Sequence, residues 1–202
     1  MSDSNPQPGD PVCVVVAKAA AEHLRGVLAG WERIVVERNY AEYDAQSPGD
    51  GLEFPDDANR DHTLVDVVAH TLEQEVELIA RNKLRLRVPL DVCVRHKFSE
   101  REIVRETGRI QLAEIDRYAA LTQRVAVAFA PVRLPTLDES GVDWAVWDGE
   151  AGGVRPVANP IRAHLRELRQ WTSIVRVHLA ATVATDAPIL AGFGGEQLRE
   201  AA

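Results

Sequence analysis

Apolar and polar residues alternate along the chain from position 84 to position 98. One parity carries Leu84, Leu86, Val88, Leu90, Val92, Val94, His96 and Phe98. The other parity includes four cations, Arg85, Arg87, Arg95 and Lys97. Because successive side chains of a strand point to opposite faces, this pattern predicts a long, half-buried strand with an apolar face and a cationic face. Pro89 cannot donate a ladder hydrogen bond, so the strand is expected to bulge there or to lie at an edge.

Hydrophobic periodicity in the rest of the chain predicts three helices and four more strands. Helical spacing covers residues 12–28, 99–129 (with a break at Gly108) and 160–168. Alternating or β-branched runs predict strands at residues 33–39, 63–71, 142–147 and 170–179. Residues 73–82 are expected to be a charged, partly extended connector, and residues 149–156 a loop.

These elements predict an α+β fold in which helices pack on one face of an antiparallel or mixed sheet of four to five strands. Ser99 and Glu102 form a capping-box pattern that is expected to open the second helix. Val92 and Val94 are expected to be buried beneath that helix. One domain is predicted over residues 12–180, between a flexible arm at 1–11 and a tail at 181–202.

Composition and charge narrow the class of protein without indicating a chemistry. The 202 residues are 46% hydrophobic and 27% charged, which is typical of a soluble globular protein. The net charge of −8 argues against nucleic-acid binding through bulk electrostatics. Two cysteines favour a reducing compartment over a disulfide framework, and no apolar run is long enough to predict a membrane span.

Residues 41–62 form an acidic stretch without apolar periodicity. The acids are Glu42, Asp44, Asp50, Glu53, Asp56, Asp57 and Asp61, against a single arginine. Long unpatterned segments inside a domain are usually solvated insertions or functional loops. The stretch is therefore either a solvated insertion or a docking loop for a basic partner, with Asp56 and Asp57 as candidate contacts.

The search for catalytic or metal-binding residues finds no recognisable site. None of the six histidines has the HExxH or another ligand spacing. Asp66 and His70 share a strand face but would lie about 13 Å apart. Cys93 has no companion histidine motif, so packing is a better interpretation than nucleophilic catalysis. We expect no enzyme activity, cofactor or metal. The cationic stripe, together with Trp144 and Trp147 on a weak strand, is instead a candidate subunit or partner surface.

Two local patterns carry a resemblance to a known family. The first runs from Val35 to Tyr40, continues through the acidic stretch and ends in Leu64-Val-Asp-Val-Val68. The second begins Asn159-Pro-Ile-Arg-Ala-His and ends Trp171-Thr-Ser-Ile-Val-Arg-Val-His178. Across about residues 12–179, the order of elements and these patterns resemble the tail-terminator, or tail-completion, neck proteins of long-tailed bacteriophages.

The resemblance implies a structural virion protein in the neck of the phage, assembled in the host cytoplasm. It implies a homo-oligomeric ring, expected to be a hexamer, that ends tail-tube polymerisation and provides the surface for head–tail joining. Its partners would be further copies of itself, the tail tube protein and a head-completion or connector protein. No membrane and no sequence-specific nucleic acid is implied, although DNA would pass through the ring.

Three alternatives stay open at this point. The ring could sit one layer nearer the portal as a head–tail connector. A non-viral adaptor could bind a partner through the acidic stretch. A small enzyme would need a polar constellation that the sequence does not display.

Overall fold

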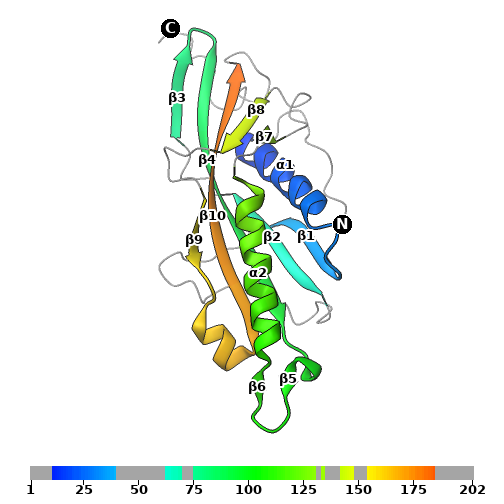
Figure 1. Cartoon of the computed structure of the whole chain (residues 1–202). Helices are drawn as coiled ribbons and strands as arrows, with labels where there is room; N and C mark the ends of the chain where they lie inside the picture. The colour runs from blue at the N-terminus through cyan, green and yellow to red at the C-terminus, as the bar shows by residue number, and fades with distance from the viewer. Residues whose placement is uncertain are drawn as a thin grey trace.

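The computed structural model describes residues 11–39, 62–69, 75–130, 133–134, 142–147 and 154–184. Two main helices pack on one face of a long, twisted sheet (Figure 1). The helices are α1 (Val12–Val27) and α2 (Leu112–Ala128), with short helices η1 (Glu100–Glu102) and η3 (His164–Leu168). The strands are β1 (Ile34–Asn39), β2 (Thr63–Ala69), β3 (Glu75–Ala80), β4 (Lys83–Lys97), β5 (Ile103–Val104), β6 (Arg109–Ile110), β7 (Arg133–Leu134), β8 (Val142–Trp147), β9 (Val154–Ala158) and β10 (Gln170–Ala184).

The sheet confirms the predicted α+β class with a mixed sheet. Its order is β1-β2-β4-β10-β8-β7, with β3 added to β4 and β9 added to β10, which makes eight strands among the residues described. β1 and β2 are parallel, and the other pairs are antiparallel. β4 and β10 pair along their whole length, from Lys97 opposite Gln170 to Lys83 opposite Ala184. These two strands form the spine to which the other strands attach.

Pro89 lies inside β4 without the predicted bulge, because the pairing with β10 is continuous through this position. On the opposite side of β4, β2 pairs with the residues from Leu90 onward and β3 pairs with the residues up to Arg87. Neither register includes Val88 or Pro89. Pro89 therefore lies where β4 changes its partner from β3 to β2. Because no strand pairs with β4 on that side at this position, the missing amide hydrogen costs no ladder hydrogen bond.

The core fills the space between the helices and the sheet. α1 packs on β1 and β2, and α2 packs on β10. The β-branched residues 14–16 of α1 are all buried, so burial outweighs their weak helix propensity. His23 of α1 hydrogen-bonds through Nε2 to the carbonyl oxygen of Ala128, at 2.8 Å. Val92 and Val94 are fully buried, as predicted, but the main helix that packs most on β4 is α1 and not the predicted α2.

Five segments differ from the sequence-based expectation. Residues 103–110 form the β5–β6 hairpin instead of helix, because Gly108 adopts a φ of 64°, which a turn uses and a helix does not. The capping box of Ser99 and Glu102 is present but opens only the short helix η1. The expected connector at 73–82 contains β3, whose alternating residues pair with β4. β9 falls partly in the expected loop at 149–156, and β10 continues past position 179.

No helix in the part of the chain that the structure describes is long and apolar enough to cross a membrane.

Candidate functional site

The four cations predicted on β4 do not share one environment. Arg95 is buried and donates from Nε and Nη2 to Oδ2 of Asp66, at 2.9 and 2.7 Å. The strand is half-buried only at its start, because residues 88–96 are buried on both faces. A buried guanidinium requires a paired carboxylate. The expectation that Arg95 belongs to an exposed contact surface is therefore wrong.

A second buried ion pair lies beside the first. Arg176 of β10 donates from Nε and Nη2 to the two carboxylate oxygens of Asp91, at 2.8 and 2.9 Å. Asp91 lies directly opposite Arg176 in the register. Such bidentate pairs hold a fixed geometry. The two pairs link β2, β4 and β10 on the face opposite the main helices.

The thiol of Cys93 lies fully buried between these pairs. Burial raises the pKa of the Cys93 thiol well above its usual value, and the charges of Asp66 and Asp91 raise it further. The thiolate is the nucleophilic form of cysteine. Cys93 therefore stays protonated at neutral pH and acts as a small apolar side chain, which agrees with the packing interpretation of the sequence.

The remaining predicted contact residues are separated in the structure. Arg87 forms an ion pair with Glu75 of β3 at 2.9 Å, and Arg85 is half-buried opposite Glu77. Lys97 donates from Nζ to the carbonyl oxygen of Leu168. The backbones of Trp144 and Trp147 belong to β8, but their side chains lie outside the described part of the structure, as do Asp56 and Asp57.

A polar cluster lies at the end of β4 where the sheet, η1 and α2 meet. Nδ1 of His96 forms a hydrogen bond with the hydroxyl of Thr63, and the two atoms lie 3.2 Å apart. Nε2 of the same ring lies 3.1 Å from Oε1 of Glu102. The backbone N–H and the hydroxyl of Ser99 both donate to Oε2 of Glu102 at 2.7 Å. The ring of Tyr118 stacks on His96 with centroids 4.4 Å apart. A cavity of about 220 Å³ adjoins these residues.

The electrostatics of this cluster indicate a structural role. Burial lowers the pKa of His96, although Glu102 acts in the opposite direction. Burial acts to raise the pKa of Glu102, but the hydrogen bonds from Ser99 and the interaction with His96 act against it, and the net pKa is lowered. Burial raises the pKa of Tyr118 to about 12. At neutral pH a neutral His96 is thus held between a hydroxyl and a carboxylate. Both ring nitrogens are engaged, so neither is available as a general base.

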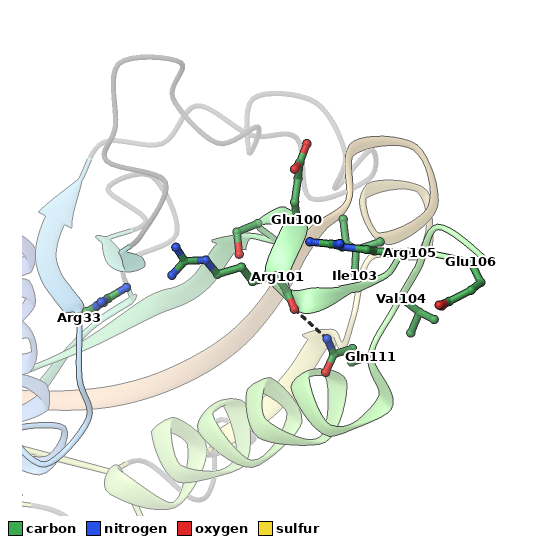
Figure 2. Close-up of a pocket in the computed structure, with 9 residues that line it drawn as sticks. Arg33, Glu100, Arg101, Ile103, Val104, Arg105, Glu106 and Gln111 are labelled. Carbon is green, nitrogen blue, oxygen red and sulfur yellow. Dashed lines mark hydrogen bonds between the residues drawn. The ribbon is translucent and has the colours of Figure 1, made fainter.

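Beside this cluster an arginine-lined groove of about 920 Å³ opens to solvent (Figure 2). We define the groove by Arg33, which precedes β1, and by residues of η1 and the β5–β6 hairpin: Ser99, Glu100, Arg101, Ile103, Val104, Arg105, Glu106 and Gln111. Arg33 and Arg101 point toward each other across the opening (Figure 2). Gln111 donates from Nε2 to the carbonyl oxygen of Arg101 at 2.7 Å, which ties η1 to the start of α2. The lining has mixed charge, because the carboxylates of Glu100 and Glu106 accompany the three arginines.

A different exposed feature lies on β3. Val76, Leu78 and Ile79 are 59%, 56% and 47% exposed. Val76 pairs with Leu86 of β4, and Leu78 pairs with Leu84. Val76 and Leu78 therefore extend the apolar face of the sheet beyond Leu84 and Leu86, which are buried. β3 pairs with β4 alone among the described strands, so no described strand covers its outer edge. Edge strands with exposed apolar residues are sites of association.

The described residues contain no group of three or more His, Cys, Asp or Glu side chains arranged to hold a metal ion. No protein-family model matches this chain, and a search of curated proteins found no match.

Sequence reasoning missed both the groove and the exposed edge. The alternation of Glu75-Val-Glu-Leu-Ile79 was the signal for the edge. The groove had no such signal, because Arg33 is brought to the η1 residues only by the fold.

Proposed function

We propose that this protein is a structural component of the neck of a long-tailed bacteriophage. Its subunits form a ring at the head-proximal end of the tail, which ends polymerisation of the tail tube and provides the surface for head–tail joining. Beside the resemblance in residues 35–68 and 159–178, the observation that carries the proposal is β3. Its outer edge, which no described strand covers, and its exposed apolar side chains have the character of a subunit interface.

This function requires surfaces and no chemistry. The two groups that could suggest catalysis, Cys93 and His96, are buried and engaged in structural contacts. A ring needs two different surfaces on each subunit that contact each other around a closed circle. Its interfaces should each bury about 1,200–2,000 Å² or more, the range of stable protein interfaces. Further partners are the tail tube protein on one side of the ring and a head-completion or connector protein on the other.

Native mass spectrometry of the purified protein, alone and with tail tubes, tests the proposal. We expect one closed oligomer, a hexamer, that binds the ends of tubes. A protein that stays monomeric at all concentrations, and also in the presence of tubes, would contradict the proposal. Rings that bind the head connector but not the tubes would place the protein one layer nearer the head.

A further inference from the structure

We draw no further inference here: the strongest candidate, the outer edge of β3 with the exposed side chains of Val76, Leu78 and Ile79, already supports the proposed ring, and nothing in the structure shows what covers it.

Discussion

Replacing Asp66 by asparagine perturbs the buried charge network in the most controlled way. The side chain keeps its shape, but Arg95 loses the carboxylate that accepts from its Nε and Nη2 at 2.9 and 2.7 Å. Both side chains are only 6% exposed, so water cannot replace the lost partner. The guanidinium remains charged inside the folded protein.

The cost follows from the burial. Removing one partner of a buried ion pair typically costs about 3–5 kcal/mol of folding free energy. For a chain of this size, about 2–4 °C of melting temperature corresponds to each kcal/mol. Asp66→Asn should therefore melt about 6–20 °C below wild type. The double variant Asp66→Leu/Arg95→Met removes both charges and should lie within about 1 kcal/mol of wild type or above it.

An exposed pair provides the matched control. Glu75 and Arg87 form an ion pair at 2.9 Å with side chains 71% and 30% exposed. Glu75→Gln should cost less than about 1 kcal/mol, because solvent screens exposed pairs. Urea unfolding followed by circular dichroism measures all three variants. If Asp66→Asn unfolds at the same urea concentration as Glu75→Gln, the argument that burial determines the cost is refuted.

Further predictions concern the core, the histidine cluster and the thiol. Val94→Asp places an unpaired charge at a fully buried position and should cost about 4 kcal/mol or more; a melting temperature within two degrees or so of wild type would show that the position is not core. Because the pKa of His96 is lowered from 6.5 in the fold, the unfolded chain gains a proton first as pH falls below 6.5, so stability should decrease there. His96→Gln should flatten that part of the profile in urea titrations between pH 8 and 5, and an unchanged slope would exclude His96 as its origin. In a Cys13→Ala background, Cys93 should react with a thiol reagent only as fast as the protein unfolds, and rapid labelling of native protein would contradict its burial.

Elements whose pattern is local could be predicted from the sequence. The alternation at residues 84–98 corresponds to β4, and the apolar stripe at residues 12–28 corresponds to α1. The prediction of a helix at residues 99–129 was wrong for its first part, because Ile103 and Ile110 have helical spacing yet pair across a hairpin. Local periodicity cannot distinguish a helix from a hairpin when a glycine such as Gly108 permits a turn.

The environment of the charged residues could not be predicted in the same way. Asp66, Asp91, Arg95 and Arg176 look like surface residues in the sequence, and each is paired only because β2, β4 and β10 lie side by side. The groove depends likewise on Arg33 reaching residues almost seventy positions later in the chain. Long-range pairings of this kind follow from topology, which a single sequence specifies only indirectly.

The length of tails in a phage that lacks this gene tests the central claim most directly. Electron micrographs of the lysate, with and without purified protein added back, give the distribution of tail lengths. We expect tails of uncontrolled length that do not join heads, and recovery of joined particles of uniform length after addition. Uniform tails attached to heads in the absence of the gene would contradict the account.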